Sequence, residues 1–434
     1  MKTLRVSVSL LALWFAGTLF ADESSDLLGV VILSRHGVRS SLTSSAGLKR
    51  LSDREWPKWD IGNGILTEHG FRVMRQFGGY YGEYLRAEGL LPAGNDGLAH
   101  AYFRSNVVPR TVATAKAIGE GLFPGAEVGV VSFVGRGKER DPMFDPEGYR
   151  EFSIDGDAAL ASAKTIGVEK KTEALRPVLR EIAGVLTTPT MPVEKQPWWQ
   201  KESSFKRNDK ALVSYSGPVT HAFFATDNFF MQYLEGLPLS EVGWGKVGRE
   251  ELVRFSALHG ASFGFFGAGE SPYASRVYYS TMGDRILRTL RAMGGEPRPA
   301  GALGKSGDNL VVIGAHDSTV FGIGALFGFR WKAPDNLAPG LILPGSALMF
   351  EVRRDKATSR RFVRTRFVCQ TLDQIRNELP VTLAKPPFTD PVAVAGVKTT
   401  GPELDQDWDE FLRVVGEKTD PAFVLDPAAD PSAH

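Results

Sequence analysis

The sequence predicts an α/β protein: a mainly parallel sheet flanked by helices, into which a mostly helical cap domain is inserted. Two apolar runs predict the sheet. Val30–Leu33 and Leu310–Ala315 are unbroken and rich in β-branched residues, as in strands buried on both faces of a parallel sheet. Between about residues 137 and 300 the strand–helix alternation is lost, and helical and turn-rich segments replace it. We therefore assign 22–136 and 301–434 to the α/β core and 137–300 to the cap.

The composition is that of an ordinary globular protein. The chain has 434 residues, of which 43% are hydrophobic and 23% charged, so it can bury a large core. Its formal net charge is +1, so no global field favours nucleic acid or a membrane surface, and we expect neither as a partner. Any preference for an anion must come from a local cluster. The oligomeric state does not follow from the sequence.

The amino terminus has the pattern of a secretory signal peptide, which we place at 1–21. Lys2 and Arg5 form a basic start, a largely apolar stretch follows, and Ala21 can precede the cleavage site. Cys369 is the only cysteine, so no intramolecular disulfide can form, which a periplasmic protein does not require. We expect a periplasmic or secreted protein that is free of the membrane after cleavage.

An uncleaved membrane anchor is the alternative for this segment. Leu19 stands where a signal peptidase usually finds a small residue, which leaves the exact cleavage site open. The apolar stretch is, however, somewhat short for a membrane-spanning helix. No later stretch is long and apolar enough to cross a bilayer.

The first apolar run ends in a cluster of potential cations, Arg35, His36 and Arg39. Such a cluster at the end of a buried strand is costly unless an anion or acid offsets it. In open α/β sheets ligands bind at the carboxyl ends of the strands. Phosphate matches the planar donor fork of arginine, so the sequence predicts a phosphate site here.

Two helices are expected in the first half of the core. Leu66–Leu85 reads as a helix that Thr67 can cap, and Gly70 and Gly78 would permit close packing on the sheet. After a strand at 101–105, Pro109 opens a second helix, because proline is tolerated in a first turn.

Arg110 lies at the amino end of this second helix. There its side chain would join the backbone N–H groups in facing an anion. The alternative is that a lone arginine at a helix end is a solvated surface residue.

The cap segment contains three features that bear on function. Residues 158–186 are expected to be helical, and 189–210 to form a long surface excursion rich in proline and charge. Residues 221–235 read as a strongly apolar helix with Asp227 in its middle. An acid among aromatic residues needs a partner, which makes it a candidate for a site; the alternative is an exposed stripe of the helix.

The second apolar run ends in His316 and Asp317. If the two strands are parallel, His36 and His316 lie at the same edge of the sheet. One strand then supplies histidine and arginine, and the other histidine and an acid. These are a nucleophile, charge clamps and a proton donor for phosphoryl transfer, although the residues alone do not say which histidine is the nucleophile. Residues 341–350 and 362–368 are expected to form two later strands, which can be antiparallel.

These motifs resemble those of a known family. The stretch from Arg35 to Arg39, Arg-His-Gly-Val-Arg, resembles the RHGxRxP signature of the histidine acid phosphatases, branch 2 of the histidine phosphatase superfamily. His316-Asp317 resembles the distal HD motif of that family, in the same order and at a similarly wide separation. Further stretches at 56–60, 110–115 and 237–245 are most similar to the bacterial glucose-1-phosphatase and phytase group.

Two positions depart from the family pattern. Ser41 stands where the family usually has a proline that would stiffen the loop leaving the first motif. Thr319 stands where asparagine is more frequent, and either residue can form local hydrogen bonds at a helix start.

The resemblance implies a phosphoglycerate-mutase-like core and a two-step hydrolysis of phosphomonoesters without a cofactor or metal. His36 would attack phosphorus and form a phosphohistidine, and Asp317 would protonate the leaving group and later activate water. Four residues would hold the phosphoryl oxygens, namely Arg35, Arg39, Arg110 and His316. The family also has a carboxylate in the helix that contains Asp227, which we take as a further substrate-binding candidate. Because the acid must be protonated, we expect an acidic pH optimum.

Other classes of protein fit the sequence less well. The seven histidines show no H-x-H or H-x-x-x-H pair for a metal, and no G-x-x-x-x-G-K-[ST] loop is present for a nucleotide. A non-catalytic phosphate- or sugar-phosphate-binding protein would keep the arginines but would not need Asp317. The substrate is expected to be a sugar phosphate such as glucose 1-phosphate, or phytate. Phytate would need a more basic pocket, for which the candidates are Lys201, Lys206, Arg207 and Lys210, although a solvated loop explains these residues better.

Overall fold

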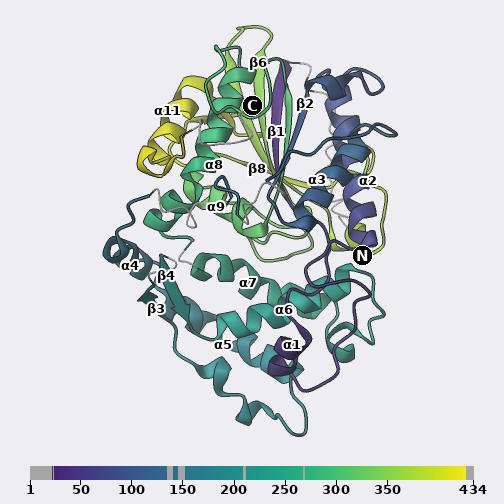
Figure 1. Ribbon diagram of the computed structural model, residues 1–434, viewed down its shortest axis with the longest axis vertical. Coiled ribbons are helices and arrows are strands. Elements are labelled where there is room, and N and C mark those ends of the chain that lie inside the picture. Colours follow the sequence, from purple (N-terminus) through teal and green to yellow (C-terminus); the bar gives the residue numbers. More distant parts are fainter. Residues whose placement is uncertain are drawn as a thin grey trace, which may run out of the picture.

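The computed structural model describes residues 22, 24–133, 140–144, 152–208, 212–266 and 269–426. The predicted signal peptide lies outside these residues. Figure 1 shows a central sheet with helices on both sides and a separate group of helices below it. Among the described residues, no helix is both long and apolar enough to cross a membrane.

The sheet is mixed, and its parallel strands are those that end in the predicted motifs. β1 (Ser25–Arg35) lies beside β5 (Leu310–Ala315), which in turn lies beside β2 (Ala101–Ser105), and both pairs are parallel. The full order is β2-β5-β1-β6-β7-β10-β9, with β8 also paired to β7. The predicted α/β fold class is confirmed.

The later strands extend the sheet through antiparallel pairs, as expected for residues 341–350 and 362–368. The strands are β6 (Ala347–Asp355), β7 (Arg361–Cys369), β8 (Phe388–Val392), β9 (Thr399–Thr400) and β10 (Asp405–Asp407). The first of them begins only at Ala347, not near residue 341. Gly345 has a φ of 81°, a left-handed conformation that a β-strand cannot contain, so the preceding residues form a turn.

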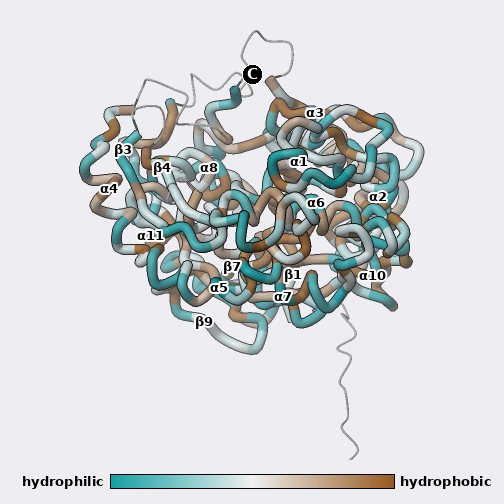
Figure 2. Tube along the Cα trace, turned by 90° about the horizontal axis from the view of Figure 1, so that it is seen from below, coloured by the Kyte–Doolittle hydropathy of each residue, from teal (hydrophilic) through white to brown (hydrophobic). Residues whose placement is uncertain are grey.

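Both faces of β1 are buried, as the unbroken apolar run predicts. Val30 and Ile32 belong to the core under α2 (Glu68–Ala87) and α3 (Pro109–Leu122). Val31 and Leu33 belong to the core on the opposite face. That face is covered by α8 (Pro272–Met293), α9 (Asp317–Phe327) and α11 (Trp408–Lys418). Seen from below in Figure 2, hydrophobic stretches lie near the middle of the molecule, around β1, and hydrophilic residues mark outer helices such as α11.

α2 is held against the first motif by its glycines. Thr67 caps the helix by accepting a hydrogen bond from the Gly70 amide at 2.8 Å. A Cβ atom on Gly70 would lie 2.2 Å from the Val38 carbonyl oxygen, and one on Gly78 would lie 2.1 Å from the Ile118 oxygen. Both glycines permit close packing, but their partners are the loop after β1 and helix α3, and not the sheet as predicted.

The group of helices below the sheet contains α1 (Ser45–Leu51), α4 (Gly156–Lys164), α5 (Val168–Val185), α6 (Val219–Leu234) and α7 (Arg249–Phe265), as Figure 1 shows. The helical prediction for 158–186 is confirmed, and the segment forms two helices, α4 and α5. Gly167 adopts a left-handed φ of 66°, which ends α4 and begins α5. The segment 189–210 is not wholly irregular, because β3 (Ser204–Arg207) pairs with β4 (Val213–Ser216).

The predicted boundaries of the cap, 137 and 300, stay a prediction, and the packing suggests a different division. α8 lies inside that segment, but it packs on β1, α9 and α11. α1 lies outside it, yet the residues that follow α1 contact the end of α5: the Ser52 hydroxyl and the Arg54 guanidinium donate to the carbonyl oxygens of Leu186 and Thr187, each at 3.0 Å. We propose that α8 belongs to the core and α1 to the cap.

Candidate active site

The two predicted motifs meet at one edge of the sheet. β1 and β5 are in parallel register, with Leu33 opposite Ile313 and Arg35 opposite Ala315. The strands therefore end together, and the ring centroids of His36 and His316 are 5.7 Å apart. This confirms the prediction that the two histidines share one edge, although they are 280 residues apart in the sequence.

His36 is held as a neutral imidazole with a free nitrogen. Its Nδ1 lies 2.8 Å from the Gly37 carbonyl oxygen, which can only accept a hydrogen bond. Nδ1 therefore carries the proton, and Nε2 keeps its lone pair. Burial lowers the pKa of His36 well below its usual value, and the nearby positive charges of Arg110 and Arg35 lower it further. An unprotonated Nε2 is the form that a nucleophile needs.

Arg35 links the two motifs through an ion pair. Its Nη1 donates to the Ile342 carbonyl oxygen at 2.5 Å, and its Nη2 lies 2.8 Å from Oδ2 of Asp317. Burial raises the pKa of Asp317, but the charges of Arg35 and His259 lower it more, to about 2. Asp317 is therefore a carboxylate when no ligand offsets the charge of Arg35.

Arg39 forms the second buried ion pair of the site, and its partner lies on helix α6. Its Nη2 lies 2.8 and 3.0 Å from the two carboxylate oxygens of Asp227 on α6, and both side chains are only 1% exposed. Asp227 therefore does not lie on an exposed stripe of its helix, the alternative that the sequence left open. The pair joins the strand end to the cap.

Arg110 reaches the same place from the amino end of α3, which begins at Pro109. Its Nη1 donates to the Gly64 carbonyl oxygen at 3.3 Å, and its Nη2 donates to Nδ1 of His316, also at 3.3 Å. Because Nδ1 accepts, the proton of a neutral His316 is on Nε2. Burial and the charge of Arg39 lower the pKa of Arg110 to about 10, so it stays a cation at neutral pH. Arg110 is thus part of the cluster and not an isolated surface residue.

The cluster has unused capacity for an anion. Three arginines face two carboxylates, and both histidines are neutral, so the seven predicted site residues carry a net charge of +1. The Nε–H groups of Arg35, Arg39 and Arg110 are buried without a hydrogen-bond partner among the described residues. An unpaired buried donor is costly, by about 1–3 kcal/mol, and an oxyanion would remove that cost. The arrangement can therefore hold a phosphoryl group in front of Nε2 of His36.

A pocket of about 240 Å³ opens onto this cluster. One part of its lining is polar and includes His36, Arg39, Arg110 and Asp317. The other part is an aromatic wall, which we define as Phe223, Phe263, Phe266, Tyr279 and Phe321. Sequence reasoning missed this wall, because aromatic residues in apolar helices give the same pattern whether they fill a core or line a pocket.

His259 is a second residue that sequence reasoning missed. It lies on α7, is 2% exposed and stacks on Phe223 with a centroid distance of 5.0 Å. Burial lowers its pKa to about 4, and it influences the charge of Asp317. No motif marks it, because a single histidine in an apolar helix is usually a packed core residue.

The loop that leaves the first motif is closed without the proline of the family pattern. The Ser41 hydroxyl accepts from the Thr43 amide at 3.0 Å, and the Ser41 carbonyl accepts from the Gly64 amide at 2.9 Å. Thr319 is buried in the first turn of α9, where its amide donates to the His316 carbonyl oxygen. Hydrogen bonds therefore replace the stiffening that the proline would give.

Three of the four basic residues suggested for a phytate pocket are not at the site. Lys201 and Lys206 are exposed, and Arg207 pairs with Asp157 on the surface at 2.9 Å. None of the three lines the pocket. Lys210 lies outside the described residues. Among the described residues, no group of three or more side chains is placed to hold a metal ion.

The fold and the cluster are those of an α/β protein that can bind a phosphoryl group at the end of a parallel strand pair. The family model of the histidine phosphatase superfamily (branch 2) matches residues 26–171. Over these residues the chain is similar to this branch of the superfamily.

The similarity to relatives extends over most of the chain. It is 28% identical over 382 residues to a glucose-1-phosphatase from Providencia rettgeri, covering 84% of this chain and 86% of the relative. It is 26% identical over 422 residues to the phytase AppA of Escherichia coli (strain K12), covering 94% and 95%. The structure of the Hafnia alvei phytase superposes with a TM-score of 0.83 at 26% identity, over 94% of this chain and 100% of that one.

Proposed function

We propose that the protein is a histidine-type acid phosphatase that hydrolyses phosphomonoesters through a phosphohistidine. The observation that carries this proposal is a neutral, buried His36 whose free Nε2 lies among three arginines with unpaired N–H groups. The similarity to a glucose-1-phosphatase and to phytases supports it.

In the first step, Nε2 of His36 attacks phosphorus, and the bond from phosphorus to the ester oxygen breaks. The charge that spreads over the phosphoryl oxygens is held by the guanidinium groups of Arg35, Arg39 and Arg110. His316 donates a further hydrogen bond from Nε2. Because these groups are fixed by the sheet edge and by α3, little reorganisation is needed during the reaction.

Asp317 supplies and then takes back a proton. It gives its proton to the leaving alkoxide, and as a carboxylate it then accepts a proton from the water that attacks the phosphohistidine. Phosphate leaves, and His36 is free again. A bound phosphoryl dianion offsets the charge of Arg35 and so raises the pKa of Asp317 from about 2, which allows the carboxyl group to be protonated in the complex at acidic pH.

A non-catalytic phosphate-binding protein explains these residues less well. His36 is neutral at physiological pH, so it adds no charge to attract an anion. Its lone pair also faces repulsion from the oxygens of a bound phosphate unless it bonds to phosphorus. A binding protein would gain from a lysine or arginine at this position, whereas a nucleophile requires the neutral ring.

We also propose that residues 1–21 are removed during export and that the enzyme acts in the periplasm or outside the cell. The basic start and apolar stretch of the sequence support this. The relatives support a sugar phosphate or phytate as the substrate.

The test is hydrolysis of p-nitrophenyl phosphate at about pH 5 in EDTA by the wild type, His36→Ala and a control, His100→Ala. His100 is an exposed histidine that contacts the Gly307 carbonyl. We expect metal-independent turnover that falls on the order of a thousandfold or more in His36→Ala and is kept in His100→Ala. An absence of turnover at every pH, with phosphate still bound, would refute the enzyme and favour a binding protein.

A further inference from the structure

The pocket around the candidate site is unevenly built. Its phosphate-binding end is charged, but the part that would surround the alcohol of a substrate is apolar. That part consists of Leu42 and the aromatic wall, with Ser318 and the hydroxyl of Tyr279 as its only polar groups. Leu42 is 38% exposed, so an apolar side chain is presented at the pocket instead of being packed away.

The described lining offers no cation for a second phosphate. Its only cations are Arg39 and Arg110, which belong to the first phosphate position, and Arg39 is already paired with Asp227. A further phosphate group would lie against aromatic rings, whose faces are electronegative. For a substrate with several phosphates, the pocket therefore offers cations to one phosphate group only, and the aromatic wall disfavours the others.

The hydroxyl groups of a sugar are matched no better. Each hydroxyl that enters the pocket gives up hydrogen bonds to water, and only two side-chain hydroxyls are present to replace them. An aromatic or alicyclic alcohol group carries no such hydroxyl groups, so it gives up no hydrogen bonds to water, and it gains contact with the aromatic rings. Phe223 and Phe266 meet edge to face at 5.1 Å, and Phe263 and Phe321 lie 6.0 Å apart, so the wall is continuous.

We propose that the pocket selects monophosphate esters of aromatic or other apolar alcohols over sugar phosphates and over phytate. This preference rests on the proposed phosphatase activity, but it departs from the sugar phosphate or phytate that the relatives support as the substrate. The cavity of about 240 Å³ suits one ring beside the phosphoryl group. Phe266 and Leu42 are the specificity-determining residues that this proposal names.

The test compares esters of non-phenolic alcohols, which are primary except in phytate, so that the basicity of the leaving group stays similar. The substrates are benzyl phosphate, cyclohexylmethyl phosphate, glucose 6-phosphate and phytate, each assayed by phosphate release at the same pH. We expect kcat/KM for the two apolar esters to exceed that for glucose 6-phosphate and phytate by about tenfold or more. Equal or reversed values would refute the preference and leave the phosphatase intact.

Binding to His36→Ala separates the two proposals if none of these esters is hydrolysed. That outcome would refute the phosphatase, whereas calorimetry would still report whether benzyl phosphate binds more tightly than glucose 6-phosphate. The preference fails if it does not.

Two variants test the residues. Phe266→Ala should lower the ratio of kcat/KM for benzyl phosphate to that for methyl phosphate, whereas Phe388→Ala, a half-buried phenylalanine of β8, should not. Leu42→Lys should raise phytate turnover relative to benzyl phosphate. If neither ratio moves, the wall does not set the preference.

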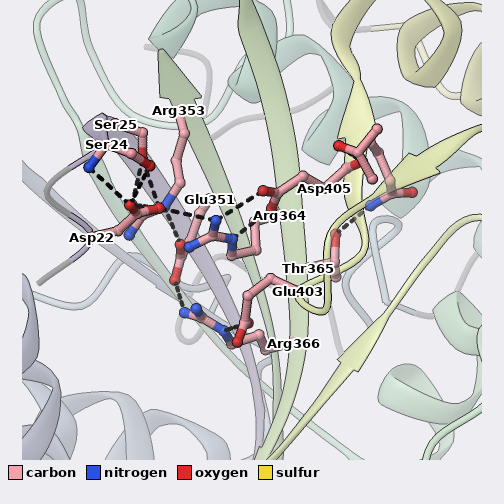
Figure 3. Close-up of polar contacts among 12 residues, drawn as sticks. Asp22, Ser24, Ser25, Glu351, Arg353, Arg364, Thr365, Arg366, Glu403 and Asp405 are labelled. Atoms are coloured by element: carbon pink, nitrogen blue, oxygen red, sulfur yellow. Dashed lines mark hydrogen bonds and ion pairs between the residues drawn. The ribbon is translucent and has the colours of Figure 1, made fainter. Parts of the chain in front are cut away.

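A second inference comes from the opposite end of β1, where an ion-pair network surrounds Asp22 (Figure 3). The Asp22 carboxylate lies 3.0 Å from Arg364 and 3.6 Å from Arg353. Its backbone nitrogen donates to Oε1 of Glu88 at 3.2 Å, and Oε2 of Glu88 lies 2.7 Å from Arg353. Glu88 is 4% exposed.

This network has too few cations. Its carboxylates are those of Asp22, Glu88, Glu351, Glu403 and Asp405, and its guanidinium groups are those of Arg353, Arg364 and Arg366. Among the described residues of the network, five negative charges therefore face three positive ones. A further cation beside Glu88 would reduce the imbalance, and the nitrogen of Asp22 already occupies that place.

We propose that export processing cleaves the bond between Ala21 and Asp22 and that the new α-ammonium group forms an ion pair with Glu88. A signal peptidase would add water across the peptide bond, leaving a carboxylate on Ala21 and an amine, protonated at neutral pH, on Asp22. This ion pair would then hold the mature amino terminus at the start of β1.

Mass spectrometry of the exported protein and its thermal stability between pH 7 and pH 10 test this. We expect a chain that starts at Asp22. An α-ammonium group has a pKa near 8 when unfolded, and Glu88 raises it in the fold, so its stabilisation is present below pH 8 and is lost as the pH rises.

Between pH 7 and pH 10 the Tm of the wild type should therefore fall. This fall should exceed, by about 2 °C or more, the fall in Glu88→Gln and the fall in a chain with one extra alanine before Asp22. The other charged groups beside the amine, namely the Asp22 carboxylate, Arg353 and Arg364, are the same in all three proteins. A different starting residue, or the same loss in all three, would refute the ion pair.

Discussion

Replacing Asp227 by asparagine tests the buried ion pair that joins the strand end to the cap. Asparagine keeps the shape and one hydrogen-bond acceptor but removes the charge, which leaves Arg39 buried at 1% exposure without its counter-ion. Breaking a buried pair typically costs about 3–5 kcal/mol, and the retained hydrogen bond returns about 1 kcal/mol. We therefore expect the free energy of unfolding to fall by about 2–4 kcal/mol without phosphate.

Phosphate should reverse much of this loss. The net charge of the cluster rises from +1 to +2 when Asp227 is neutralised, so an anion beside Arg39 replaces the missing carboxylate. A ligand at a hundred times its Kd stabilises a fold by about 2.7 kcal/mol. The assay is urea unfolding with and without inorganic phosphate, followed by fluorescence.

The matched control is Asp157→Asn, which breaks an exposed pair with Arg207 and should cost at most about 1 kcal/mol. If Asp227→Asn is as stable as this control in the absence of phosphate, the pair does not hold the cap to the sheet. If phosphate does not recover its stability, the cluster is not a phosphate site.

Three further predictions follow from named contacts. Asp317→Asn should slow the hydrolysis of benzyl phosphate by about 10²–10⁴-fold. In stopped-flow it should still give a burst of p-nitrophenol from p-nitrophenyl phosphate, since that leaving group needs no acid. Equal slowing of the burst would contradict the role of Asp317 as the proton donor. The pKa of Asp317 is lowered from 3.8 to about 2 in the fold. Its pairing therefore adds about 2 kcal/mol to the free energy of unfolding above pH 4, and this contribution is lost as the pH falls through 2. Acid titration of Asp317→Asn should lack this loss. In thermal unfolding, Gly70→Ala should destabilise the fold by more than about 2 kcal/mol, because its Cβ would lie 2.2 Å from the Val38 carbonyl oxygen. The control is Gly79→Ala in the same helix, whose Cβ meets nothing within 4 Å and which should stabilise the fold by up to about 1 kcal/mol.

The sequence was sufficient to predict the elements that carry the site. Val30–Leu33 and Leu310–Ala315 are apolar on both faces, so each had to be a buried strand, and the charged residues that follow had to lie at its end. Proline in the first turn marked the start of the helix that positions Arg110. These features are local, because strand burial and helix capping depend on residues within a few positions.

Other features needed the tertiary structure, because they depend on contacts between distant segments. The partner of Asp227 is 188 residues away, so no local pattern could distinguish a buried ion pair from an exposed acid. Phe266 and Leu42 have the same local pattern whether they pack in a core or line a pocket. The break at Gly167 between α4 and α5 does not follow from the local pattern, because one glycine in a helical pattern is usually tolerated.

The sequence by itself therefore determined the kind of chemistry, since the histidines, arginines and acid that perform it follow two recognisable strands. Only the tertiary structure decided which charges are already paired, which nitrogen of His36 is free and what surrounds the leaving group. The physical reason is that residue types fix which groups can react, whereas packing fixes their protonation, their partners and the space that remains for a substrate.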